Sequence, residues 1–171
     1  MSRERQGEWH EWPFEPLEIL QAFAKYEVNY VLVGALAAIL QGSPLPAYTV
    51  DITLAPGQDN YNNLLGALKE LEAVDLSETS DDVRPADQTS LTFYTSAGHV
   101  DIDCPLPGFK TYNEVRRESN LIELDNLSVS TLSLRGIVRS KAAIGDQSQL
   151  AALEATMELY RGLTTSSKPE I

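Results

Sequence analysis

The sequence predicts one mixed α/β domain with a central mixed sheet flanked by helices. Segments with helical periodicity alternate with short strand-like runs, and a small hairpin pattern follows, which argues against a helical bundle or a β-sandwich. The chain has 171 residues, enough for one domain with a real core and too few for two comfortable ones. Its hydrophobic share of 43% is ordinary for a globular protein.

The individual elements follow from periodicity and from helix-breaking residues. Pro16 is favoured in the first turn of a helix, while Gly34 stands at the junction between a strand and the next helix. Strand periodicity is clearest where Val50, Ile52 and Leu54 alternate with polar residues. We predict helices at residues 16–26, 35–41, 60–73, 112–117, 132–144 and 147–162, and strands at 30–33, 48–54, 91–95, 99–104, 121–124 and 127–129.

We predict three parts along the chain. Residues 1–14 form an N-terminal arm whose Trp9, Trp12 and Phe14 could dock on the domain or on a partner. Residues 15–162 form the domain, and residues 163–171 a C-terminal tail. Within the domain, the acidic segment 77–89 lacks an apolar period and is predicted to be a solvated loop.

The charge balance limits the classes of partner. The formal net charge is −12, from 25 acidic and 13 basic residues. A long nucleic acid is disfavoured, because affinity for its phosphates comes largely from lysine and arginine. A small nucleotide with a metal ion, or a basic protein partner, fits better. It is equally consistent with the sequence that the net negative charge only keeps the protein soluble and indicates no partner.

The remaining bulk features indicate a cytoplasmic protein that does not enter a membrane. The N-terminus lacks the apolar core of a secretory signal, and the longest apolar run is too short to cross a bilayer. A single cysteine, Cys104, rules out an internal disulfide, and we interpret it as a core residue. The sequence does not indicate an oligomeric state.

The most informative stretch spans residues 30–53, YVLVGALAAILQGSPLPAYTVDIT. It predicts a buried strand, a helix that begins at Gly34 and a second strand that carries Asp51. A further acidic strand follows, with Asp101 and Asp103 on one face. Carboxylates can hold the divalent ions that nucleotidyl transfer requires, and a helix N-terminus favours phosphate. We therefore expect Asp51 and Asp101 to converge in front of Gly34.

These segments, with NNLLGALKEL, GHVDIDCPLPG, TYNEV and SLRGIVRSKAAIGDQSQLAALEA, resemble small bacterial nucleotidyltransferase-fold proteins of the polymerase-beta superfamily, of the AbiEii toxin-component type. The resemblance covers roughly residues 17–160. It implies a nucleotidyltransferase-like fold, with Mg²⁺ or Mn²⁺ and an NTP as cofactors. By this resemblance Asp51 and Asp101 would be catalytic and would hold the metal, and we add Asp103, on the same strand face as Asp101, as a candidate metal ligand. Phosphates are bound by Gly34, Ala35, Arg139 and Lys141.

The chain also departs from that family. Ala35 stands where the family has Gly or Ser after the glycine. The family's Asp-x-Asp pair falls either on Thr49 and Asp51 or on Asp51 and Thr53, so one carboxylate is replaced by threonine. The family's Lys-Asp after the last Ser-Lys position is also missing. Threonine is a weaker ligand for a hard cation than a carboxylate.

Several of these residues have plainer explanations. Asp103 could replace the lost ligand, or it could cap the turn before Pro105. Arg139 and Lys141 could contact phosphates, or they could complement the dipole at the end of their helix. We interpret His99 as lying off the acidic face, and therefore not as a proton shuttle.

Two functions remain open from the sequence. One is an active, metal-dependent nucleotidyltransferase that moves a nucleotidyl group from an NTP to a protein or small acceptor. The other is a catalytically lapsed module of the same fold that binds a nucleotide or a protein, as a toxin–antitoxin partner or a complex subunit.

Overall fold

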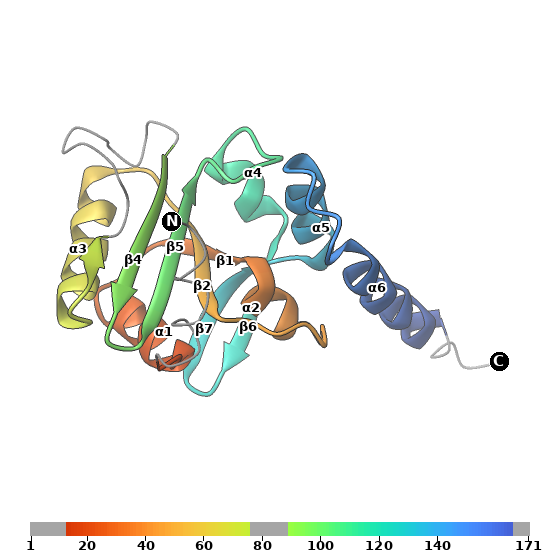
Figure 1. Cartoon of the computed structure of the whole chain (residues 1–171), viewed down its shortest axis with the longest axis horizontal. Coiled ribbons are helices and arrows are strands. Elements are labelled where there is room, and N and C mark those ends of the chain that lie inside the picture. Colours follow the sequence, from red (N-terminus) through yellow and green to blue (C-terminus); the bar gives the residue numbers. More distant parts are fainter. Residues whose placement is uncertain (1–12, 76–88, 166–171) are drawn as a thin grey trace, which may run out of the picture.

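A computed structural model describes residues 13–75 and 89–165 of the chain. A single seven-stranded sheet runs through the molecule in the order β3-β4-β5-β2-β1-β7-β6, and helices flank it (Figure 1). The strands are β1 (Tyr30–Val33), β2 (Thr49–Leu54), β3 (Val74–Asp75), β4 (Thr89–Thr95), β5 (Gly98–Cys104), β6 (Ser119–Leu124) and β7 (Leu127–Leu132). The helices are α1 (Pro16–Lys25), α2 (Gly34–Ile39), α3 (Gln58–Glu70), α4 (Tyr112–Arg117), α5 (Leu134–Ala143) and α6 (Leu150–Thr165).

The sheet is mixed, as predicted. Strand β2 pairs antiparallel with β1 on one side and parallel with β5 on the other. Parallel pairs also join β1 to β7, whereas β4 with β5 and β6 with β7 are antiparallel. The parallel β2–β5 pair joins segments about 50 residues apart, with Asp51 opposite Asp101 and Ile52 opposite Ile102.

Alternation along the central strands separates a core face from a polar face. Val50, Ile52, Val100 and Ile102 are at most 1% exposed and fill one face. On that face α1 packs through Phe23, whose ring meets Tyr30 edge-on at 5.3 Å between centroids. Because side chains alternate along a strand, Asp51 and Asp101 lie on the opposite face. Helix α2, which follows β1 directly, lies against β2.

The C-terminal helix α6 extends away from the sheet (Figure 1). It contacts α5, and its Leu153 is fully buried, while Leu159 is 67% exposed. No helix among the described residues is long and apolar enough to cross a membrane.

Most predicted elements are present, with shifted ends. Helix α4 has the predicted bounds, and α1 ends one residue earlier than expected. Helix α3 begins at Gln58 because Gly57, with φ 130°, ends the preceding turn earlier than expected. Helix α6 begins at Leu150, since an Asp146–Ser148 turn occupies the predicted first residues. The two-residue strand β3 was not predicted, because its residues carry no alternation.

The predicted three-part division is only partly visible. Of the arm, Phe14 packs against the core, while Trp9 and Trp12 lie outside the described residues. Most of the predicted acidic loop, residues 77–88, also lies outside them, and its last residue, Thr89, begins β4.

Candidate active site

Two carboxylates from distant parts of the chain lie side by side on the polar face of the sheet. Asp51 of β2 and Asp101 of β5 are register partners on hydrogen-bonded parallel strands. Neighbouring strands are about 4.8 Å apart, so partner side chains on one face are close enough to share a ligand. The structure thus brings together the two acidic segments that the sequence indicated.

Gly34 makes room for the Asp51 carboxylate. A Cβ atom added at Gly34 would collide with Asp51 Oδ2 and Cγ, and the backbone of Gly34 has φ 70°, which favours glycine. Val33, just before it, is the register partner of Asp51. We expected Gly34 to admit a phosphate close to the backbone, but in this structure it admits the carboxylate. Ala35 follows in the first turn of α2, half-buried.

The Asp51 carboxyl is held partly protonated near neutral pH. Its removal from water and, as the second cause, the negative charge of Asp101 together raise its pKa from 3.8 to about 7. Hydrogen bonds from Thr49 Oγ1 to Asp51 Oδ1 and Oδ2, at 3.1 and 3.2 Å, oppose this shift. Asp103 adds a smaller unfavourable charge, and Lys141 a smaller favourable one.

Hydroxyl groups, not cations, contact the three carboxylates. Thr92 Oγ1 donates to Asp101 Oδ1 at 2.8 Å, and Ser90 Oγ donates to Asp103 Oδ1 at 2.7 Å. Both donors come from β4, directly opposite their acceptors. Within the described residues, no lysine or arginine is paired with any of the three acids. The alternation of Ser90 and Thr92 along their strand was a signal that we did not use.

Asp103 lies on the same face as Asp101, two residues further along β5. Its bond to Ser90 shows a local partner within the strand pair rather than a turn cap. Within the described residues, however, no group of three or more His, Cys, Asp or Glu side chains is spaced to hold a metal ion. Among these residues, Asp51 and Asp101 are the two carboxylates that could hold a divalent cation, with hydroxyl groups around them.

Of the two cations that we considered for phosphate binding, Lys141 is nearer to the acidic face. It lowers the pKa of Asp51 through its charge. Its ammonium lies 3.6 Å from Asp146 Oδ2, a loose contact, and its side chain is only 17% exposed. Lys141 is therefore paired with Asp146, and its positive charge also acts on Asp51.

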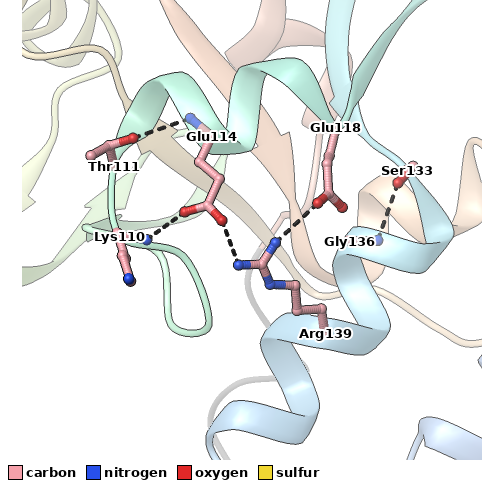
Figure 2. A network of polar contacts seen from close by, with 7 residues as sticks. All are labelled: Lys110, Thr111, Glu114, Glu118, Ser133, Gly136 and Arg139. Carbon is pink, nitrogen blue, oxygen red and sulfur yellow. Dashed lines mark hydrogen bonds and ion pairs between the residues drawn. The ribbon is translucent and has the colours of Figure 1, made fainter.

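Arg139 is instead fully engaged between α4 and α5 (Figure 2). Its guanidinium donates to Glu114 Oε1 at 2.6 Å and to Glu118 Oε1 at 3.0 Å. It also lies over the Phe109 ring, 4.1 Å from the centroid. The Lys110 backbone N–H and Arg139 together lower the pKa of Glu114. To bind phosphate, Arg139 would have to break two ion pairs.

The prediction that the His99 side chain lies off the acidic face was wrong. His99 is two residues before Asp101 on β5, so the two side chains lie on the same face. The imidazole is 8% exposed and meets the Tyr94 ring edge-on at 4.4 Å. Burial lowers its pKa, and the charge of Asp101 opposes that effect. The sequence already implies this placement, because residues two apart on a strand lie on the same face.

Solved structures of nucleotidyltransferases have a similar fold. The lincosamide antibiotic adenylyltransferase LnuA, solved with lincomycin bound, aligns with a TM-score of 0.60 at 13% identity, over 83% of this chain and 96% of that one. A Thermotoga maritima protein assigned to the nucleotidyltransferases, TM1012, aligns with a TM-score of 0.52 at 15% identity. The alignment covers 91% of this chain and 98% of that one. The chain has a nucleotidyltransferase fold.

A third similar structure is the antibiotic-resistance factor ANT(2'')-Ia, with a TM-score of 0.51 at 10% identity, over 88% of this chain and 91% of that one. No family model and no curated protein sequence matches the chain. At these identities the likeness extends to the fold and not to the substrate.

Proposed function

We propose that this protein is a metal-dependent nucleotidyltransferase that moves a nucleotidyl group from an NTP to a small acceptor or to a protein. The observation that carries the proposal is the pairing of Asp51 with Asp101 against Gly34. Two like charges held together and partly out of water are unfavourable unless one of them is protonated or a cation joins them. A fold shared with two antibiotic-modifying proteins supports the reaction class.

The residues have separate roles in this proposal. Asp51 and Asp101 would hold Mg²⁺ or Mn²⁺, which would offset the charge that develops on the transferring phosphoryl group. Lys141 would bind phosphate oxygens, since it is the described cation whose charge reaches Asp51. The first backbone N–H groups of α2, at Gly34 and Ala35, lack partners within the helix and would donate to the same anion.

The neighbourhood of Asp51 also supports this assignment. Thr49 and Thr92 hold the two carboxylates by hydroxyl donation, which fixes their orientation without neutralising them. A bound cation would displace a neutral hydroxyl donor more readily than it would displace the cation of an ion pair, because charge-assisted hydrogen bonds are stronger. The acceptor would approach along the same polar face.

The direct test is transfer of label from α-labelled ATP with Mg²⁺ or Mn²⁺. Lincomycin, tobramycin and the protein itself serve as acceptors. Asp51→Ala and Asp101→Ala should each lower transfer by at least about 100-fold, because metal charge stabilises most of the transition state. Asp59→Ala, an exposed acid in the first turn of α3, is the matched control. Equal background from the wild type and all three variants would remove the proposal.

Cation binding gives a second readout that does not depend on the acceptor. Titration with Mn²⁺, followed by electron paramagnetic resonance, should show a site that weakens in Asp51→Ala and Asp101→Ala but not in Asp59→Ala. If the wild type binds no Mn²⁺ with or without ATP, the metal assignment fails even where nucleotide binds.

One observation favours a second function, that of a lapsed enzyme acting as a toxin–antitoxin partner or complex subunit related to the AbiEii type. Thr49 and Thr53 flank Asp51 on its strand face, so neither side supplies a second carboxylate. Thr49 donates to both Asp51 oxygens, whereas Thr53 is 1% exposed.

Thr49→Asp separates the two functions, with Thr53→Asp as the control. A lapsed enzyme should bind ATP, seen as a raised Tm, without transfer, and should gain transfer with Thr49→Asp alone. A wild type that already transfers, with no gain from Thr49→Asp, would contradict the lapsed function.

A further inference from the structure

A second cavity lies away from the acidic face, at the end of β1 that is remote from Gly34. It is a cleft of about 760 Å³ between the end of α1, helix α4 and the β6–β7 hairpin. Strands β1 and β7 are register partners at Leu32 and Thr131 only. Toward Tyr30 this pairing stops, and the cleft lies there, with Ser128 and Ser130 of β7 among its walls.

The cleft is distinct from the proposed catalytic site. Its wall includes Tyr30, whose register partner is Leu54, three positions along β1 from the pair of Val33 with Asp51. At about 3.3 Å per residue, this separates the two places by about 10 Å along the strand. Neither Gly34 nor either of the paired acids lines the cleft.

The lining has the opposite charge to the rest of the chain. The protein carries 25 acidic residues, yet none of the described residues that line the cleft is acidic. The lining has one cation, Arg116 of α4, which forms no ion pair with any described residue. Arg139, in the same region, is by contrast neutralised by two glutamates.

The serine hydroxyls of the wall have protein partners, with Ser128 bonded to Glu123 and Ser119 to Ser130, but three other polar side chains have none within the described part of the chain. Among the described residues, none is hydrogen-bonded to the side-chain amides of Asn113 and Asn120 or to the hydroxyl of Tyr112. Tyr112 lies one helical turn before Arg116, and the positive charge of Arg116 partly offsets the rise in the pKa of that phenol caused by burial. Amide and hydroxyl groups beside a guanidinium are suited to a ligand with both hydroxyl groups and a negative charge.

We propose that this cleft binds a small organic anion that carries several hydroxyl groups, with its anionic group on Arg116 and its hydroxyl groups on the side-chain amides of Asn113 and Asn120. Phosphate and carboxylate can both accept two parallel hydrogen bonds from a guanidinium, and either fits. The proposal does not depend on nucleotidyl transfer, since the ligand lies outside the acidic face.

The test is a titration of the full chain, without metal or nucleotide, followed by ¹H–¹⁵N NMR and calorimetry. Ribose 5-phosphate and gluconate are the probes that carry both hydroxyl groups and an anionic group. Ribose tests the hydroxyl groups alone, and inorganic phosphate tests the anionic group alone. We expect saturable shifts at the backbone amides of Asn120, Ser128 and Ser130 with one or both anionic probes. Ribose and phosphate should bind more weakly, since each makes only half of the contacts.

Arg116→Met should weaken this binding by about 10-fold or more, while Arg116→Lys retains part of it. Arg117→Met, the adjacent arginine that does not line the cleft, should bind as the wild type does. Three outcomes would overturn the proposal: no saturable shift with either anionic probe, shifts centred on Gly34 and Asp51, or equal loss in both methionine variants. Because no metal or nucleotide is present, these outcomes are separate from failure of the proposed transfer activity.

Discussion

Two charged clusters of this protein show opposite solutions to the same electrostatic problem. At the α4–α5 junction, Arg139 is enclosed by Glu114, Glu118 and the Phe109 ring, and its charge is compensated by the chain itself (Figure 2). On the acidic face, Asp51 and Asp101 face each other with hydroxyl donors only. The junction is complete without a ligand, whereas the acidic face lacks the positive charge that would complete it.

This difference separates a structural cluster from a candidate functional one. A compensated cluster stabilises the packing of two helices and gains nothing from an added ion. An uncompensated cluster costs folding free energy, and a chain retains such a cost most readily where a ligand removes it. The predictions below either break this contrast or make it quantitative.

The largest expected effect is at Gly34, where the acidic face is packed most tightly. In Gly34→Ala, the new methyl group would collide with the Asp51 carboxylate and would strain a backbone with φ 70°. We expect a loss of about 2–5 kcal/mol in the free energy of unfolding, together with weaker Mn²⁺ binding. Chemical denaturation measures the first and paramagnetic resonance the second.

Gly145→Ala is the matched control for this change. Gly145 also has φ 70°, but nothing lies within 4 Å of its added Cβ. It should lose only the strain, about 1–2 kcal/mol, and keep its cation binding. Equal losses in the two variants would show that Asp51 is not held against Gly34 in solution.

The next effect is the pH dependence that Asp51 confers. Because its pKa is about 7 in the folded protein and near 3.8 when unfolded, the folded state binds more protons between these values. Its contribution to stability therefore falls as pH rises from about 4 to about 7. Asp51→Asn has no carboxyl to ionise at this position, so its free energy of unfolding should exceed that of the wild type near pH 8. The difference is at most about 4 kcal/mol, because the pKa of Asp51 differs by about three units between the folded and unfolded states.

Urea denaturation of both proteins across this pH range, without divalent cations, measures the gap, which should vanish near pH 4. Added Mg²⁺ should stabilise only the wild type and narrow the gap at high pH. A gap that is constant with pH would mean that Asp51 is ionised and already compensated.

The smallest effect compares the two cations of α5. Lys141→Met should raise the KM for the nucleotide by about 10-fold, because it removes a charge-assisted contact with phosphate. Arg139→Met should leave that KM unchanged and instead lower the Tm by a few degrees, since two glutamates lose their partner. Steady-state kinetics and thermal melts of both variants measure the pair. A nucleotide KM that depends on Arg139 would reverse the assignment.

The pattern of residues accounted for most of the fold. The alternation of Val50, Ile52 and Leu54 placed Asp51 on a polar strand face, and Gly34 marked the start of a helix. These are local properties, since the period of a strand and the backbone freedom of glycine depend on few neighbours. The same rule, counted correctly, also places His99 with Asp101.

What the sequence by itself determined is therefore the order of the elements and the face on which each acid lies. Only the tertiary structure decided that β2 pairs in parallel with β5, so that Asp51 meets Asp101 across 50 residues of chain. It likewise decided that Arg139 pairs with glutamates of α4, while the charge of Lys141 acts on Asp51. The physical reason is that strand register and helix docking are fixed by burial of the whole core, to which distant segments contribute together and which no local period encodes.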